Sequence, residues 1–483
     1  MSFLGLSTEL IQSIASFLPQ VDLLNISFTC KRLHDATEPE LLRVYLCPRG
    51  GNPIAKFVKR LLEDPNRMRH VQIVHLKDWI TLSRLSPKEV RDRYEEGYDE
   101  LVSQPDESDY RLFTEAAKAN GVIDTILPYE TESSLLARLE NERFGEQWRP
   151  WTDNIPWQET VFDDQLEYDD IPCYSIFCQQ LRAGIDEPLI QILLAMLPNL
   201  RELYLHDIPH DEYALPWLHP RHESPLRKLV AQGVGRDHEW PISFVQHGIS
   251  GQLESLELYA ATSWGNDPRT RTYVRRPLHL PPGRLNIGRI DLEACLLTYW
   301  DMETLLDTCS GLKSFRFSLG EVKDGADNFT STELVTLLSK HKSSLEELHI
   351  DLSHHWPRGW DLNPIASLDD FTSLRTISMN PRDLDWMAED LSWFARDGLP
   401  KHKRLHNRLP KSLEHLTFFE LKKYYSDDLN YRTRQHPQSH LDMKQLQALL
   451  SRDHGSLPNL ASVTLIVPEE EPYLPLHNHT DPI

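Results

Sequence analysis

The sequence lacks the signatures of secretion and of membrane insertion. It has six cysteines in 483 residues and no Cys-x-x-Cys pair, which favours reduced thiols over a disulfide framework. The N-terminus has no basic segment followed by an apolar core, and no apolar run approaches the roughly 20 residues of a membrane helix. We therefore expect a protein of the cytoplasm or the nucleus that has no membrane partner.

Motifs of catalysis are missing as well. The sequence contains no G-x-x-x-x-G-K-[ST], G-x-G-x-x-G, G-x-S-x-G or H-E-x-x-H. Its 22 histidines include three close pairs, without the neighbouring cysteines or helical spacing of a zinc site: His219 and His222, His354 and His355, His477 and His479. The sequence thus predicts a protein that is not an enzyme and holds neither a metal nor a cofactor.

Positive charge is in deficit. The chain has 51 Lys and Arg against 73 Asp and Glu, a net charge of -22, which disfavours nucleic acid as a partner. Between Lys88 and Asp170 there are 23 acidic residues and 8 basic ones. We interpret residues 81–190 as an acidic insertion with amphipathic helices over 112–119 and 135–144. It is either a solvated addition to the edge of a larger domain or a negative surface for a basic partner.

Apolar side chains recur at helical spacing near the N-terminus. One helix is expected to present an apolar stripe made of Leu10, Ile14, Phe17 and Leu18. Ser7 can cap the start of this helix, and Pro19 ends it. Asp22 is a candidate cap for a second helix, which would present Leu23, Leu24, Ile26 and Phe28. Short helices of this kind cannot bury all these side chains among themselves, so the remaining stripe predicts a partner surface. A helical hairpin packed on its own domain is the alternative.

The same stretch resembles an F-box, a pattern that begins Leu-Pro-x-Glu-Leu, reaches Asp-Leu-Leu and closes with a basic pair before leucine. The corresponding parts here are Leu6-Ser7-Thr8-Glu9-Leu10, Asp22-Leu23-Leu24 and Lys31-Arg32-Leu33, with Ser7 where the family usually has proline. The resemblance covers about a tenth of the chain. It implies docking on the Skp-family adaptor of a cullin–RING ubiquitin ligase. The implied adaptor-facing residues are Leu6, Leu10, Ile11, Ile14, Leu18, Leu23 and Leu24.

A second pattern runs from residue 200 nearly to the C-terminus: apolar, two residues, apolar, one residue, apolar. Its instances begin 25 to 47 residues apart, and Met68, Val71, Ile73 would be an earlier member. The nine instances start at Leu200, Leu226, Leu253, Ile287, Leu312, Leu345, Leu374, Leu413 and Leu460. Helix-like segments at 299–309, 331–341 and 443–450 lie between them.

Strand and helix alternating at this period resemble the leucine-rich repeat. The resemblance implies an α/β fold, in which N-terminal F-box helices precede an irregular solenoid with parallel strands on the concave face and helices on the convex face. Members often have Asn or Cys three residues after the last leucine, and Cys295 fits that position. The uneven spacing predicts long loops, for example at Trp264–Pro282 and Asp383–Lys411. A generic α/β domain remains the alternative.

These observations give a division of the chain and a candidate binding face. We assign residues 1–46 to the F-box, 47–80 to a first repeat-like unit or linker, 81–190 to the insertion, 191–468 to the repeats and 469–483 to a flexible tail. In each strand the residue between the second and third apolar positions points away from the core. The substrate-binding candidates on that face are Tyr204, Glu257, Tyr259, Asp291, Arg316, His349 and Asp351.

The two resemblances together, of the kind combined in fungal F-box proteins with leucine-rich repeats, imply a non-catalytic substrate receptor of a Skp–cullin–F-box ubiquitin ligase. Its partners would be a Skp-family adaptor, through it a cullin–RING ligase, and a protein substrate that the sequence does not identify. One alternative is a repeat scaffold or inhibitor without a ligase role. Another is an enzyme built on the acidic insertion, which would need a pocket lined by two carboxylates of raised pKa.

Overall fold

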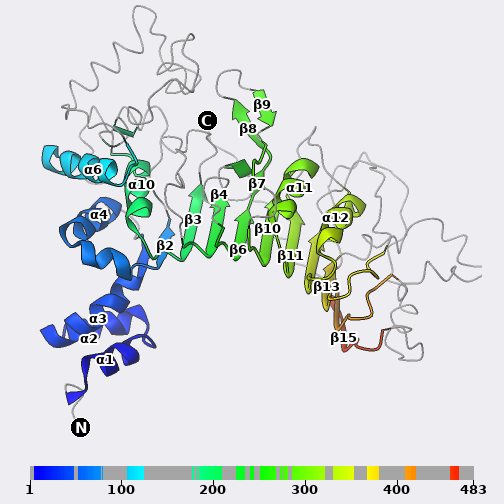
Figure 1. The fold of residues 1–483 in the computed structure, drawn as a ribbon, viewed down its shortest axis with the longest axis horizontal. Coiled ribbons are helices and arrows are strands. Elements are labelled where there is room, and N and C mark those ends of the chain that lie inside the picture. The colour runs from blue at the N-terminus through cyan, green and yellow to red at the C-terminus, as the bar shows by residue number, and fades with distance from the viewer. Residues whose placement is uncertain are drawn as a thin grey trace, which may run out of the picture. The chain divides into compact units, whose positions relative to one another are not determined.

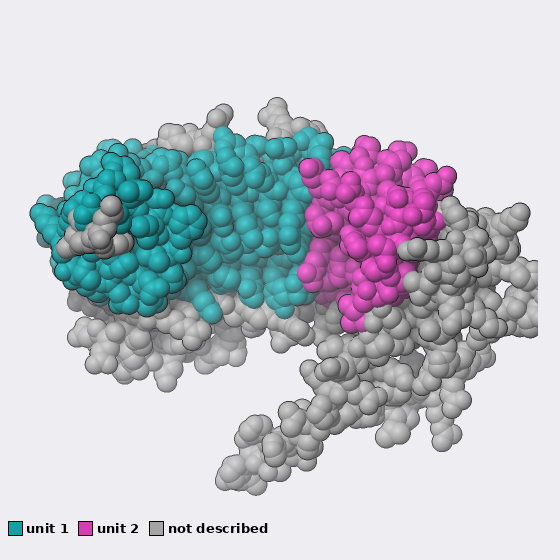
Figure 2. Space-filling model, turned by 90° about the horizontal axis from the view of Figure 1, so that it is seen from below, with its two compact units in different colours: residues 1–312, 324–328 teal, residues 313–323, 329–483 magenta. Residues whose placement is uncertain are grey.

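The structure is a computed structural model whose residues form two compact units (Figure 2). Unit 1 comprises residues 1–312 with 324–328, and unit 2 comprises residues 313–323 with 329–483. The structure describes residues 5–47, 53–77, 79, 106–123, 177–178, 181, 184–208, 225–233, 240–243, 251–267, 272–275, 277–280, 285–320, 330–352, 367–379, 408–419 and 457–466.

Three helices open unit 1: α1 (Thr8–Ala15), α2 (Gln20–Ser27) and α3 (Lys31–Arg43). Ser7 caps α1 as predicted, because its Oγ accepts a hydrogen bond from the Leu10 amide at 3.4 Å. The predicted cap of the second helix is wrong. Pro19 takes the N-cap position of α2, and Asp22 lies in the first helical turn, where the helix dipole favours a carboxylate.

The helices run directly into the sheet of unit 1. β1 (Val44–Leu46) follows α3 without a linker and pairs in parallel with β2 (Ile73–Leu76), after α4 (Pro53–Glu63) and the 3-10 helix η2 (Pro65–His70). The side-chain amide of Gln20 donates to the carbonyl of Val44 at 2.8 Å, and Arg67 pairs with Glu38 at 2.9 Å. Contacts from α2 to β1 and from η2 to α3 therefore connect the N-terminal helices to the sheet on either side of the α3–β1 junction.

Four further parallel strands complete the sheet of unit 1 in the order β1-β2-β3-β4-β6-β10 (Figure 1). They are β3 (Glu202–Ile208), β4 (Lys228–Gly233), β6 (Ser255–Tyr259) and β10 (Arg289–Cys295). Each strand contains the second and third residues of a predicted apolar triplet, and side chains such as Leu203, Leu256 and Ile290 are fully buried. The earlier member is displaced: Val74 and Leu76 align with Leu203 and Leu205, so the triplet is Val71, Val74, Leu76 rather than Met68, Val71, Ile73.

Helices α6 (Glu107–Ala119) and α10 (Glu187–Met196) pack with α4 on unit 1 (Figure 1). Lys59 of α4 pairs with Asp109 of α6 at 2.6 Å, and Tyr110 and Phe113 are buried. Helix α6 belongs to the predicted insertion over 81–190, so the described part of that insertion at 107–119 is a helix packed on α4 and α10. The predicted helix over 135–144 lies outside the described residues.

The segment expected to be a long loop after Trp264 contains regular structure. β8 (Trp264–Asp267) and β9 (Thr272–Arg275) form an antiparallel hairpin, and β5 (Trp240–Pro241) pairs with β7 (Ala261–Thr262). Helix α11 (Tyr299–Thr308) follows β10 and matches the predicted helix over 299–309. Cys295, at the predicted turn position, is buried, and its thiol donates to the carbonyl of Glu293 at 3.4 Å.

Unit 2 repeats the alternation of strand and helix. Its parallel strands are β11 (Ser314–Leu319), β12 (Glu347–Asp351), β13 (Thr376–Met379), β14 (His415–Phe419) and β15 (Ser462–Ile466), in that order. Helix α12 (Ser331–Leu338) and the 3-10 helix η7 (Ser339–His341) connect β11 to β12, as the pattern over 331–341 predicts. The predicted helix over 443–450, most of the loop over 383–411 and the tail lie outside the described residues.

Candidate functional site

The three N-terminal helices have a small interior. Ile11 of α1 packs with Leu33 and Ala36 of α3, and partly buried Leu6, Ile26 and Cys30 surround them. Arg32 links the start of α3 to the segment before α1, because its guanidinium donates to the carbonyl of Leu6 at 2.5 Å. The basic pair of the motif thus includes one residue that fixes the chain before α1.

Six apolar side chains remain outside this interior, and we call them the helical apolar patch. Phe17 is 85% exposed, Phe28 78% and Val21 69%. The members of the patch are Leu10, Ile14, Phe17, Val21, Leu24 and Phe28. Full burial of an aliphatic or aromatic side chain is worth about 1.5–3 kcal/mol, so a patch of this size favours a partner surface.

The structure divides the predicted adaptor-facing residues. Leu10, Ile14 and Leu24 are exposed and belong to the patch, and Leu6 and Leu18 are half-buried. Ile11 and Leu23 are 1% and 3% exposed, and Ile11 packs in the interior of the bundle, so we leave both out of the proposed adaptor contacts. Phe17 and Phe28 were in the predicted apolar stripes but not in the adaptor-facing set, and Val21 was in neither, although the patch follows an alternating spacing of four and three residues in the sequence.

The sheet of unit 1 carries polar and aromatic side chains on the face opposite its leucines. The pairing register aligns one residue from each of six neighbouring strands, and we call this set the cross-strand row. It consists of Leu46, His75, Tyr204, Val230, Glu257 and Asp291. Three predicted substrate-binding residues, Tyr204, Glu257 and Asp291, therefore lie in one line. Tyr259 lies two residues beyond Glu257 on the same face.

The rings of this row stack on each other. The His75 and Tyr204 rings are parallel within 6°, with centroids 3.9 Å apart, and the Lys228 ammonium lies 5.4 Å from the Tyr204 centroid. Burial and the neighbouring His206 lower the pKa of His75, so the imidazole is neutral at physiological pH. Burial and the hydrogen bond from its hydroxyl to Glu202 raise the pKa of Tyr204.

The acidic end of the row is surrounded by cations. Glu257 pairs with Lys228 at 2.9 Å and lies 3.9 Å from Arg289, which also lies 3.5 Å from Asp291. The hydrogen bond and charge of Glu257 raise the pKa of Lys228 against the opposing effect of its partial burial. These are part-exposed pairs of modest energy, which a partner can rearrange at little cost.

Unit 2 has its own row on the corresponding face. The register aligns Arg316 with His349, Ser378, Thr417 and Thr464, while Asp351 lies opposite Ser318. The His349 ring stacks on Phe419 with centroids 5.3 Å apart. Burial, and secondly the Arg316 charge, lower the pKa of His349 to about 4. The other three predicted substrate-binding residues, Arg316, His349 and Asp351, are thus on neighbouring strands of unit 2.

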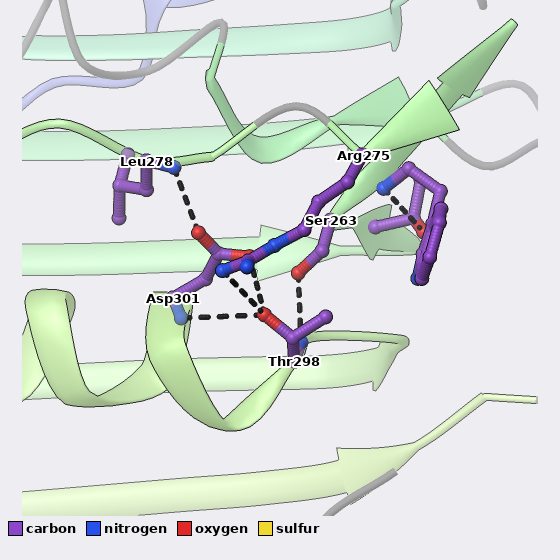
Figure 3. Close-up of polar contacts among 7 residues, drawn as sticks. Ser263, Arg275, Leu278, Thr298 and Asp301 are labelled. Carbon is purple, nitrogen blue, oxygen red and sulfur yellow. Dashed lines mark hydrogen bonds and ion pairs between the residues drawn. The ribbon is translucent and has the colours of Figure 1, made fainter. Parts of the chain in front are cut away.

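A buried polar cluster lies where the β8–β9 hairpin meets α11 (Figure 3). Asp301 is 1% exposed, and its carboxylate accepts hydrogen bonds from the Leu278 amide and the Thr298 hydroxyl, both at 2.7 Å. The Ser263 hydroxyl accepts from the Thr298 amide at 2.7 Å, and Arg275 lies 3.9 Å from Asp301. These polar groups are hydrogen-bonded to one another, so the cluster fastens the hairpin to the N-terminus of α11.

Within the described part of the chain, no group of three or more His, Cys, Asp or Glu side chains is arranged to hold a metal ion. The histidine pairs at 219/222, 354/355 and 477/479 lie outside it. Burial raises the pKa values of Cys295 and Cys309 to about 12, so both thiols are protonated and poor nucleophiles. No helix among the described residues is both long and apolar enough to cross a bilayer.

Comparison with known families gives one match. The F-box domain matches residues 3–42, the stretch that contains α1, α2 and nearly all of α3. No curated protein matches the chain. The family match thus coincides with the helices that carry the helical apolar patch.

Proposed function

We propose that this chain is the substrate-binding subunit of a Skp–cullin–F-box ubiquitin ligase. The observation that carries the proposal is the helical apolar patch, left exposed by the segment that matches the F-box domain. F-box domains dock on Skp-family adaptors, and F-box proteins are generally non-catalytic. Within the match, Leu10, Ile14, Phe17, Val21, Leu24 and Phe28 would contact the adaptor.

The sheet would hold the client. Parallel strands that follow one another in sequence, each with a buried apolar triplet, are consistent with leucine-rich repeats, and we propose that architecture for residues 191–468. The exposed faces of the two units would then bind a protein substrate, through Tyr204, Glu257, Tyr259 and Asp291 in unit 1 and Arg316, His349 and Asp351 in unit 2. The gain in rate would come from holding the client near the ubiquitin-charged enzyme.

Adaptor binding tests the proposal. The full chain is co-expressed with a Skp-family adaptor and purified, and the complex is compared with the double variant Leu10→Asp, Ile14→Asp. Loss of two apolar contacts of at least ~1.5 kcal/mol each predicts affinity lower by about a hundredfold or more. The matched control is Trp300→Asp, because Trp300 on α11 is 60% exposed and lies outside the F-box match.

The control variant is expected to bind the adaptor as the parent chain does. Absence of adaptor binding by the parent, or equal binding by the double variant, would contradict the proposal. Either result would favour a scaffold or inhibitor that binds proteins without a ligase role.

A further inference from the structure

The cross-strand row has two chemically different ends. At one end Leu46 is 51% exposed and lies beside the stacked rings of His75 and Tyr204, with Val230 next in register. The His75 imidazole is neutral, and the two charged groups beside Tyr204 have opposite signs: Glu202 accepts from its hydroxyl, and the Lys228 ammonium lies 5.4 Å from its ring centroid. At the other end lie the carboxylates of Glu257 and Asp291 on adjacent strands.

The register positions on either side of the row add further charged residues to this face. On the same face Glu202 and Lys228 lie in register with Ser255 and Arg289, and Tyr259 lies opposite Glu293. Across the three register positions there are four carboxylates, Glu202, Glu257, Asp291 and Glu293, against two cations, Lys228 and Arg289. The face therefore has an excess of two negative charges, all on part-exposed or exposed side chains.

We propose that this face binds a protein segment that presents an aliphatic or aromatic residue to Leu46, His75 and Tyr204 and a lysine or arginine to Glu257 and Asp291. Its chemistry follows from complementarity: a ring-lined end without net charge accepts an apolar side chain, and a carboxylate pair accepts a cation. Strands lie about 4.8 Å apart, so the centres of the two ends are about 17 Å apart. An extended segment spans that distance in about five residues.

An arginine or lysine of the partner would bind by exchange of ion pairs. Glu257 already holds Lys228, and Arg289 already lies near Asp291, so the carboxylates are ordered before binding. A partner guanidinium can join or displace the Lys228 ammonium, whose pair with Glu257 is only partly shielded from water. Lys228 therefore limits the affinity for a basic segment, and its removal is expected to strengthen binding.

A peptide selection tests this assignment with the full chain, immobilised without an adaptor. The probe is a phage-displayed library of random peptides about ten residues long, long enough to span the row. We expect the recovered peptides to be enriched in Lys or Arg together with an apolar residue. The affinity of the most frequent peptide is then measured by fluorescence anisotropy.

Three variants decide the outcome. Replacing the carboxylates in the double variant Glu257→Gln, Asp291→Asn is expected to weaken the peptide about tenfold, and Lys228→Gln to tighten it about threefold. The control Glu115→Gln removes an exposed carboxylate of α6 and is expected to change nothing. Circular dichroism and adaptor binding verify that each variant is folded.

Failure to recover basic peptides, an excess of acidic ones, or equal affinity of the double variant and the parent would overturn the assignment. That the bound protein is a ligase client rests on the function proposed above. The two proposals can fail separately: a chain that selects basic peptides but does not bind the adaptor keeps this surface and loses the ligase role.

Discussion

Single residues in the N-terminal helices divide into those that hold the bundle together and those that face outward. Ile11 and Phe17 are both apolar and six positions apart, yet one is 1% and the other 85% exposed. Composition does not separate them, because a helical stripe only says which residues share a face and not which neighbour covers it. The sequence therefore predicted the apolar face but not that α3 would bury Ile11 and leave Phe17 outside.

This division predicts opposite effects for two truncations. Ile11→Ala opens a cavity in the small interior and is expected to lower the free energy of unfolding by about 2–5 kcal/mol. Phe17→Ala removes a side chain that packs on little, so its cost is expected to be within about 0.5 kcal/mol, while its adaptor affinity falls. Urea denaturation and adaptor binding measured on both variants check the contrast. A stable Ile11→Ala variant, or an unfolded Phe17→Ala variant, would contradict it.

His349 gives a pH dependence to unit 2. Its pKa is about 4 in the folded chain, where burial and Arg316 oppose the charge, against an ordinary value of 6.5. Below about pH 6.5 the unfolded chain takes up a proton that the folded chain does not, so His349 lowers the free energy of unfolding as the pH falls toward 4. Above that range the residue contributes no pH dependence.

When the pH falls from about 7.5 to about 5, we therefore expect the melting temperature of His349→Gln to decrease less than that of the parent chain. The comparison is made by differential scanning fluorimetry at both pH values. His415→Gln, an exposed histidine of the same unit, is the control and is expected to follow the parent. An unchanged pH dependence in His349→Gln would show that the imidazole is solvated.

At the scale of elements, the strands were the most predictable feature. Each of the nine apolar triplets from residue 200 onward lies on or just before a strand, because burying alternate residues on a helix-covered face requires that spacing. Apolar spacing also located the helix over 331–338, and the structure shows in addition that Thr330 and Glu333 form a reciprocal cap. The Thr330 hydroxyl and the Glu333 carboxylate accept hydrogen bonds from backbone amides that have no partner within the first helical turn.

The elements that the sequence did not predict depend on contacts made far along the chain. Helix α3 has a low apolar content and contains Pro39, so its own sequence gave little signal. The β8–β9 hairpin is held by Thr298 and Asp301, more than twenty residues after it ends, and no local pattern reports such a partner. The first triplet was assigned three residues too early. Met68 and Ile73 are apolar and have the predicted spacing, but the residues that align with Leu203 and Leu205 are Val74 and Leu76.

The polar cluster at α11 makes the hairpin sensitive to one hydroxyl. Thr298→Val keeps the shape of the side chain but removes the donor to Asp301, a buried carboxylate, and the acceptor that caps α11. The expected cost is about 1–3 kcal/mol of unfolding free energy. Faster hydrogen exchange at the Leu278 amide, which donates to the same carboxylate at 2.7 Å, is the local readout.

The control for this variant is Thr336→Val on the exposed side of α12, where the expected change is within about 0.5 kcal/mol. If Thr298→Val exchanged at Leu278 as slowly as the parent chain, the cluster would not be what holds the hairpin.

At the scale of the molecule, unit 1 contains both the F-box match and the face that we propose binds the client. The sequence analysis ended the F-box segment at residue 46 and assigned residues 47–80 to a first repeat-like unit or linker. It did not predict that α3 would continue into β1 without a linker, since that depends on Gln20 reaching Val44 and on Arg67 pairing with Glu38. The amide of Gln72 also donates to the carbonyl of Arg43 at 2.9 Å, which ties the junction to η2 and β2.

A junction held on several sides predicts a fixed geometry between adaptor and client. Spin labels on Ser13→Cys in α1 and Arg289→Cys in β10, both exposed sites, are expected to give a narrow distance distribution by pulsed electron resonance once Cys30 and Cys47 are replaced by serine. Inserting about six Gly and Ser residues between Arg43 and Val44 should broaden that distribution, because such a linker behaves as a flexible coil. Adaptor binding should persist, since the helical apolar patch precedes the insertion. A broad distribution in the chain without the insertion would mean that the helices move independently of the sheet, and client placement would then depend on the ligase rather than on this junction.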